Sequence, residues 1–155
     1  MVHLLKYERR HTLAVRLGDL MRQYGTAVLA DADYVVPVPL HARRRRARGF
    51  NQAAELAAQL DLPVVHALRR TVATRPQTAL PAAHRRRNVA GVFAPARAIG
   101  WRPAASRIRG ARVVVVDDVV TTGATVESCA RVLRQLGARE VRVLTLARVA
   151  RPRSP

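Results

Sequence analysis

The sequence predicts an α/β protein whose central, mainly parallel sheet is flanked by helices. Short apolar runs alternate along the chain with segments whose apolar residues recur at helical spacing, the usual order for parallel strands with crossover helices. Four consecutive valines, Val113–Val116, predict a central strand that is buried on both faces. Because ligands of such sheets bind beyond the carboxyl ends of the strands, we expect the functional site after Val36 and after Val116.

The N-terminal part contains a predicted helix, a strand and a second helix. A helix is predicted over about residues 10–24, with Gly25 as its stop, from the helical spacing of Leu13, Leu17, Leu20, Met21 and Tyr24. The segment Asp33–Pro39 begins as a strand, which must end near Pro37 because two prolines cannot both lie within a sheet. Asn51 is the candidate N-cap of the next helix, whose expected buried stripe is Ala53, Leu56, Ala57 and Leu60.

The middle of the chain is harder to interpret. Leu62–Val65 predicts a short strand, after which residues 69–110 show little periodicity and contain much proline, alanine and arginine. A long irregular segment inside a compact domain is usually functional, and we expect a mobile lid and an irregular insertion there. The sequence predicts one domain over residues 1–150, with residues 151–155 as a disordered tail.

Regular structure is predicted again in the C-terminal part. After the strand at Arg112–Val116, a helix is predicted from about Gly123 to Gly137, and a further strand over Val141–Leu146. The apolar face of this helix includes Cys129, which we therefore interpret as a core residue.

The composition limits the classes of protein that the chain can belong to. It has 155 residues, 28 basic against 10 acidic side chains and a net charge of +18, with Lys6 as the only lysine. This charge favours a phosphate-bearing partner, either nucleic acid or a small polyanion, unless it reflects a surface bias toward arginine. A single cysteine excludes an internal disulfide framework and a multi-cysteine zinc site, so we expect a cytoplasmic protein without zinc. No apolar run is long enough for a signal peptide or a membrane span.

The most informative segment follows the four valines. Asp117 and Asp118 come at the end of the predicted strand, where two charges are costly unless they serve a ligand. The next residues, Thr121-Thr122-Gly123-Ala124-Thr125, lead into a helix whose first backbone N–H groups can bind a phosphate. Carboxylates beside a phosphate site suggest a ribose 5-phosphate. The alternative is that Asp118 and the threonines only cap the helix.

This segment resembles the phosphoribosyl-diphosphate (PRPP) motif of type I phosphoribosyltransferases. Further blocks resemble the signature of ComF proteins, in the expected order and over most of residues 3–148. They are Val36-Pro37-Val38-Pro39-Leu40-His41, Arg48-Gly49-Phe50-Asn51-Gln52, and Gln77-x-x-Leu80 with Arg85-x-x-Asn88-Val89 and Phe93. The sequence has no counterpart of the cysteine-rich, zinc-finger-like segment at the amino terminus of many ComF proteins, which leaves a short form or a truncated start open.

The resemblance implies a type I phosphoribosyltransferase fold and a set of roles around PRPP. Asp117 and Asp118 would hold the ribose hydroxyls, and the loop Thr121–Thr125 with Thr122, Gly123 and Ala124 would hold the 5-phosphate. The diphosphate would contact the loop after the first core strand, at Pro39, Leu40 and Arg48. Mg²⁺ would bind mainly through diphosphate and ribose oxygens.

The resemblance also places part of the site in the irregular segment. Arg85 and Asn88 would close onto the diphosphate, with Arg85 as a catalytic residue. The alternative is a basic loop in which only its apolar residues matter, as anchors.

Two classes of function remain open. Thr121 stands where purine transferases of this fold have an acidic general base, and an acceptor such as ammonia, an amine or an already anionic base would not need one. The first reading is therefore an enzyme that transfers a phosphoribosyl group from PRPP to an unknown acceptor. The second is a non-catalytic PRPP or nucleotide sensor, associated with single-stranded DNA or a competence-machinery protein. A homodimer is also open.

Overall fold

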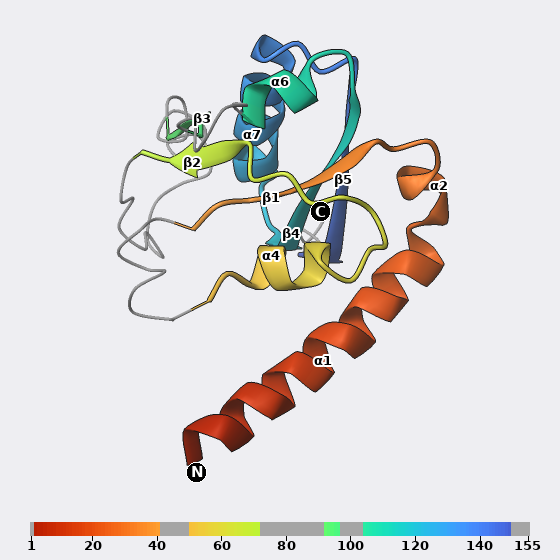
Figure 1. Cartoon of the computed structure of the whole chain (residues 1–155), viewed down its shortest axis with the longest axis vertical. Coiled ribbons are helices and arrows are strands. Elements are labelled where there is room, and N and C mark those ends of the chain that lie inside the picture. The colour runs from red at the N-terminus through yellow and green to blue at the C-terminus, as the bar shows by residue number, and fades with distance from the viewer. Residues whose placement is uncertain (1, 41–49, 72–91, 97–103, 150–155) are drawn as a thin grey trace, which may run out of the picture.

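The computed structural model describes residues 2–40, 50–71, 92–96 and 104–149, with the side chains of residues 2–11, 104 and 105 left aside (Figure 1). Its helices and strands confirm the predicted α/β class. In chain order they are α1 (Val2–Tyr24), α2 (Thr26–Leu29), β1 (Tyr34–Pro37), α4 (Gln52–Ala57), β2 (Leu68–Arg70), β3 (Phe93–Pro95), α6 (Ala104–Ile108), β4 (Arg112–Val120), α7 (Ala124–Gln135) and β5 (Glu140–Arg148).

The main sheet is parallel and has the strand order β1-β4-β5. The register pairs Tyr34 with Val113 at one end of β1 and Pro37 with Val116 at the other. Val113–Val116 are all fully buried or nearly so, as the run of valines predicted. The sheet therefore has its most apolar strand in the middle, where both faces can be covered by helices.

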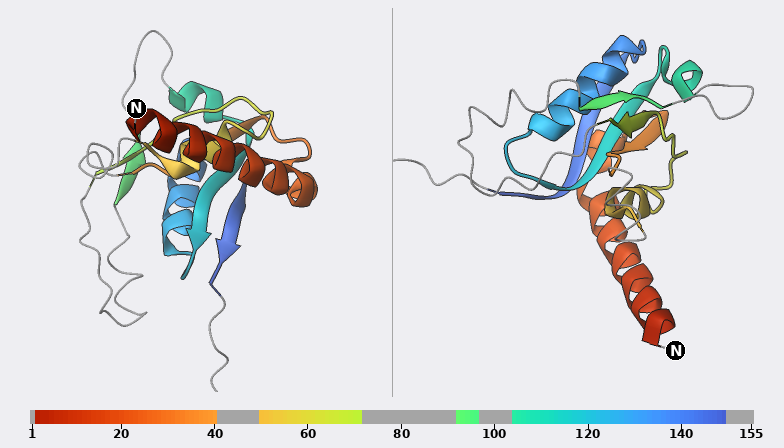
Figure 2. Two further views of the ribbon diagram at one scale, coloured as in Figure 1. Left: turned by 90° about the horizontal axis from the view of Figure 1, so that it is seen from below. Right: turned by 90° about the vertical axis from the view of Figure 1, so that its left-hand side faces the viewer.

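Each face of the sheet packs against a different layer. One core cluster joins Val113 and Val115 to α7 and to the β2–β3 pair, and includes Cys129 and Phe93. The other joins Val114 and Val116 to α1 and α4. The right-hand view of Figure 2 shows α7 and α1 on different sides of the sheet. All four residues predicted for the buried stripe of the α4 region, Ala53, Leu56, Ala57 and Leu60, are buried.

The helix α1 begins at Val2, well before the predicted start near residue 10. Its N-terminal part extends away from the rest of the described chain (Figure 1). The predicted buried stripe is partly wrong, because Ala14 and Met21 are buried whereas Leu13, Leu20 and Tyr24 are exposed. The helix packs closely on the α4 region: a Cβ added at Gly18 would lie 2.2 Å from Cβ of Gln59. The predicted stop is correct, since α1 ends at Tyr24, immediately before Gly25.

The segment between α4 and β4 differs from the sequence-based expectation in two ways. The strand predicted at Leu62–Val65 is wrong and is reduced to one parallel bridge between Val35 and Val64. Residues 69–110, expected to be irregular, contribute to the antiparallel pair β2–β3 and to α6. These strands have three residues each and pair across more than 20 residues of chain, so they leave little local periodicity. The predicted lid and the tail at 151–155 lie outside the described residues.

Candidate ribose 5-phosphate site

Asp117 and Asp118 lie within β4, whereas the sequence predicted that they follow the strand. β1 ends at Pro37, opposite Val116, but β5 continues beside β4 until Val120 pairs with Arg148. These pairings supply the backbone hydrogen bonds that extend β4 to Val120, and its last two residues are β-branched valines that favour strand geometry. The two carboxylates therefore stand beyond the carboxyl end of β1.

The two carboxylates face different layers of the molecule. Side chains alternate between the faces of a strand, so Asp117 continues the row of Val113 and Val115, and Asp118 the row of Val114 and Val116. The backbone N–H of Asp118 donates to Oδ1 of Asp117 at 3.0 Å, and that of Val119 donates to Oδ1 of Asp118 at 2.8 Å. Each carboxylate is thus held by the backbone of the next residue.

Burial raises the pKa of Asp117 from its ordinary value of 3.8 to about 6. The hydrogen bond from the Asp118 backbone lowers this pKa, the charge of Asp118 raises it, and the charge of Arg70 lowers it. The charged form of a partly desolvated carboxylate can be stabilised more by hydrogen bonds from ligand hydroxyl groups than that of a fully solvated carboxylate.

Arg70 is a residue at this site that the sequence analysis did not single out. It ends β2, and its guanidinium lies over the ring of Phe93, with Cζ 5.4 Å from the ring centroid. Its charge lowers the pKa of both Asp117 and Cys129. Only the cross-strand pairing of Arg70 with Phe93 brings this arginine toward the end of β4, so no local pattern could have identified it.

The loop predicted to hold the 5-phosphate has a left-handed glycine at the start of α7. Gly123 is the N-cap residue of α7 and has a φ of +80°, in the left-handed region that favours glycine. No atom lies within 4 Å of where its Cβ would be, so the requirement is conformational and the space above it is open. The hydroxyl of Thr122 accepts a hydrogen bond of 3.4 Å from the N–H of Ala124. Thr121 is exposed, and Thr122, Ala124 and Thr125 are half-buried, beside the N-terminus of a 12-residue helix.

The structure brings some of the predicted diphosphate residues to this edge. Pro39 and Leu40 follow β1 and are half-buried. The backbone N–H of Val38 donates to the carbonyl oxygen of Val116, and Nδ2 of Asn51 donates to the carbonyl oxygen of Val38 at 3.0 Å. Asn51 precedes α4 as predicted, but its side chain binds the loop after β1 rather than capping the helix. Arg48, Arg85 and Asn88 lie outside the described residues, so their roles remain predictions.

The same edge has groups suited to a divalent cation. Among the residues that the structure describes, no three carboxylate, imidazole or thiol groups form a metal cluster. The carboxylates of Asp117 and Asp118 are hard oxygen ligands, but each keeps a backbone hydrogen bond. This donor set fits Mg²⁺ that takes most of its ligands from a bound diphosphate, ribose and water, rather than a preformed protein cage.

Comparison with known proteins identifies the family. The family model described as "Phosphoribosyl transferase domain" matches residues 46–155. The chain belongs to this family. The DNA utilization protein YhgH of Escherichia coli O157:H7 is 35% identical over 96% of the chain, which spans 66% of that protein's length. Competence protein F of Haemophilus influenzae is 38% identical over 74% of the chain and 49% of its own length, which confirms the predicted resemblance to ComF proteins.

Solved structures agree on the fold. An allosteric regulatory enzyme of purine biosynthesis has a TM-score of 0.56 at 24% identity, over 88% of this chain and 26% of that one. A glutamine PRPP amidotransferase from Bacillus subtilis has a TM-score of 0.55 at 23% identity, with the same coverage. At this level of identity the likeness concerns the fold alone. The chain has the type I phosphoribosyltransferase fold.

No helix among the described residues has both the length and the apolar character needed to cross a membrane.

Proposed function

We propose that the protein binds PRPP with Mg²⁺ and transfers its 5-phosphoribosyl group to an acceptor, with release of diphosphate. The observation that carries this proposal is the carboxylate pair on β4, followed within five residues by a left-handed glycine at the N-terminus of α7. This arrangement offers acceptors for two ribose hydroxyls next to N–H donors for a phosphate. A helix cap alone does not require a half-buried carboxylate such as Asp117 on the preceding strand.

Each part of the site has a separate task in this proposal. Asp117 and Asp118 orient the ribose, and the loop Thr121–Thr125 holds the 5-phosphate through its N–H groups and hydroxyls. Pro39 and Leu40, with Arg48, Arg85 and Asn88 from outside the described residues, contact the diphosphate. Asp117 and Asp118 would help to hold Mg²⁺, which when bound would supply positive charge next to the diphosphate. In the reaction, the C1–O bond to diphosphate breaks, its electron pair leaves with the diphosphate, and the acceptor forms a new bond to C1.

Calorimetric titration of PRPP with Mg²⁺ into the full chain tests this function. We expect binding by the wild type and at least a tenfold loss for Asp117→Asn combined with Asp118→Asn, because neutral amides cannot replace two charged acceptors. Asp61→Asn is the matched control: Asp61 is exposed, has a φ of 53° that asparagine tolerates, and lies outside the site. Absence of PRPP binding by the wild type would refute the proposal. A release assay for diphosphate then tests turnover.

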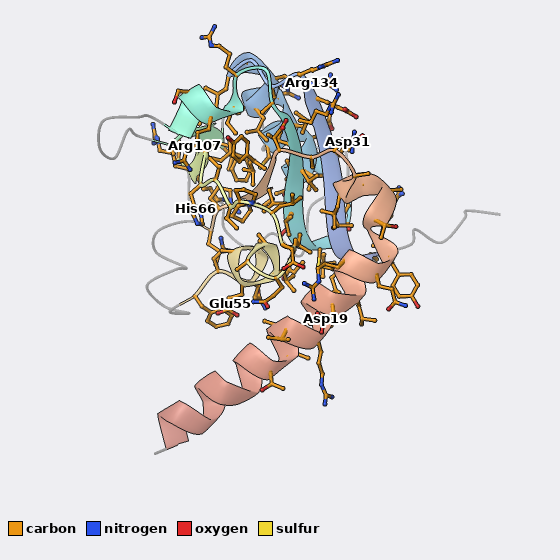
Figure 3. The ribbon with its side chains drawn as sticks, turned by 45° about the vertical axis from the view of Figure 1, so that its right-hand side comes forward. Asp19, Asp31, Glu55, His66, Arg107 and Arg134 are labelled. Atoms are coloured by element: carbon orange, nitrogen blue, oxygen red, sulfur yellow. The ribbon has the colours of Figure 1, made fainter. Side chains whose placement is uncertain are left out.

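A second candidate function is a DNA-associated protein that binds PRPP or a nucleotide without turnover. The relatives named for DNA utilization and competence favour it, as does a group of exposed arginines at the amino ends of β4 and β5: Arg107, Arg109, Arg134 and Arg139. Figure 3 shows Arg107 and Arg134 at the same end of the molecule. This end is opposite the carboxylate pair, so the two ligands need not compete.

The DNA candidate is tested by the salt dependence of binding to a single-stranded oligonucleotide. Each arginine that neutralises a phosphate of a single strand adds about 0.7 to the slope of log K against log salt. Changing all four arginines to glutamine would reduce the slope by about 3 if they contact phosphates. An unchanged slope would exclude this surface as the DNA site. PRPP binding without diphosphate release from any acceptor would favour the sensor.

A further inference from the structure

A cavity of about 270 Å³ lies on the face of β4 opposite to α7, between α1, α4 and β5. This volume lies just below the range of roughly 300–1,000 Å³ for small-molecule sites and limits the occupant to a small molecule. Its walls are mainly apolar and include Leu13, Leu17, Phe50, Leu56, Val119 and Leu146. The cavity lies next to the core cluster that α1 and α4 form with the sheet, on the side toward the carboxyl end of β4.

Among the described residues, the polar side chains that line this cavity are two acids and one amide. They are Glu55, Asp118 and Gln52, and none of the described lining residues is basic. In a chain with a net charge of +18, a cavity lined by two carboxylates is an exception. Its walls favour an apolar body, whereas its carboxylates favour N–H donors and disfavour anions. The described lining residues therefore offer no positive charge to a phosphate-bearing compound.

The position of the cavity connects it with the ribose site. Asp118, which faces α1 and α4, is the residue of the proposed ribose pair that also lines the cavity. Glu55 lies on α4, the helix between α1 and the sheet (Figure 3). A molecule in the cavity would thus lie next to a ribose held at the end of β4.

We propose that this cavity holds the phosphoribosyl acceptor, and that the acceptor is an aromatic amine without an acidic group. This inference rests on the proposed transferase function. An aromatic amine combines an apolar ring with N–H donors, and it is neutral at pH 7, so its lone pair is available without a general base at Thr121. The amine nitrogen forms a bond to C1 of the ribose while the C1–O bond to diphosphate breaks. The electron pair leaves with the diphosphate, and the proton lost from the nitrogen passes to the carboxylate of Glu55.

The test uses aniline, with phenol and 2-aminobenzoate as comparison compounds, and measures diphosphate release and the N-phosphoribosyl product by mass spectrometry. We expect turnover with aniline, and at least tenfold lower kcat/KM with phenol, which lacks the amine, and with 2-aminobenzoate, whose carboxylate the cavity repels. Glu55→Gln should lower kcat/KM for aniline at least tenfold and leave the Kd for PRPP unchanged.

Filling the cavity gives a second and independent test. Leu13 is 56% exposed, so Leu13→Trp can place its ring in the cavity without disturbing the core, and it should raise KM for aniline at least fivefold. Leu20→Trp is the matched control, because Leu20 is 45% exposed on the same helix but does not line this cavity. Direct binding of aniline, followed by NMR, should be weakened by Leu13→Trp and not by Leu20→Trp.

The outcomes separate this inference from the proposed function. If the wild type does not bind PRPP, the proposed function fails and the acceptor assignment fails with it. If PRPP binds but aniline is not turned over, or if neither Leu13→Trp nor Glu55→Gln affects its use, only the acceptor assignment is overturned. If 2-aminobenzoate and aniline have equal kcat/KM, the charge argument is wrong, and the assignment of the acceptor to aromatic amines without an acidic group is overturned.

Discussion

The guanidinium of Arg70 lies over the ring of Phe93 while its charge acts on the carboxylate of Asp117. Arg70 on β2 is paired with Phe93 on β3, and these two strands pack on the same side of the main sheet as α7. Arg70 therefore links this small antiparallel pair to the proposed ribose site.

Removing Arg70 should make Asp117 harder to ionise. We expect Arg70→Gln to raise the pKa of Asp117 above about 6, because a nearby positive charge that favours the carboxylate is lost. A carboxyl-detected NMR titration measures this shift directly. Arg69→Gln, which removes the same charge from the exposed neighbouring residue of β2, should leave the titration of Asp117 unchanged. An equal effect of both substitutions would show that net charge, and not the position of Arg70, is responsible.

The binding of PRPP should depend on pH near neutrality. The carboxylate of Asp117 is the form that accepts hydrogen bonds from ribose hydroxyls, and it is lost as the pH falls through about 6. We therefore expect the affinity for PRPP at fixed Mg²⁺ to decrease between pH 7 and pH 5, measured by calorimetry. The midpoint should move upward in Arg70→Gln. The phosphate groups of PRPP also titrate in this range, so the decisive quantity is the difference between the two proteins. Identical pH profiles for both would contradict the role of Asp117.

The same carboxylate should cost stability in the protein without ligand. Its folded pKa lies above the unfolded value, so the folded state binds more protons between about pH 4 and 6 and loses stability as the pH rises through this window. At 1.36 kcal/mol per pKa unit, the cost at pH 7 is about 3 kcal/mol. Asp117→Asn should therefore increase the free energy of unfolding at pH 7 relative to its effect at pH 4, measured by denaturant titration.

Gly123 and Gly110 offer a matched pair for the phosphate loop. Both have a positive φ, +80° and +75°, and neither has an atom within 4 Å of an added Cβ. Alanine at either position should reduce stability by about 1–2 kcal/mol, the cost of the left-handed region. Only Gly123→Ala should also weaken the binding of PRPP, because Gly110 lies at the other end of β4. If both variants bound PRPP equally after correction for unfolded protein, the loop would not be the phosphate site.

Cys129 should behave as an inert core residue. Burial and the nearby charge of Asp117 raise the pKa of its thiol to about 12, so little reactive thiolate is present at neutral pH. We expect the native protein to react with a thiol reagent at least a hundredfold more slowly than the unfolded protein. Fast labelling of the native protein would show that α7 does not stay packed on the sheet.

The sequence predicted well those parts that local patterns determine. Val113–Val116 require a buried strand, Gly123 and Gly137 bound a helix with one apolar face, and Pro37 ends a strand. The sequence-based prediction failed where pairing between distant segments determines the length of a strand. β4 extends through Asp117 and Asp118 because β5 runs beside it, and no feature near the two residues reveals this.

The site was predictable to the same extent. The motif predicted that the two carboxylates and the loop Thr121–Thr125 lie together, because they are contiguous in the chain; their roles toward a ligand stay predictions. Arg70 and the cavity below α1 were missed because they depend on which side of a helix or strand meets a neighbour. Leu13 illustrates the point: its helical spacing suggested a core position, but it lies at the exposed rim of the cavity.

The alternation of side chains along β4 gives the two adjacent carboxylates separate surroundings. Asp117 belongs to the layer of α7 and Cys129, and Asp118 to the layer of α1 and α4. The number of residues between the start of β4 and the pair fixes which carboxylate enters which layer. A deletion of one valine from Val113–Val116 would exchange the two environments while keeping every side chain of the motif. The length of the valine run, as well as its apolar character, is therefore part of the site's specification.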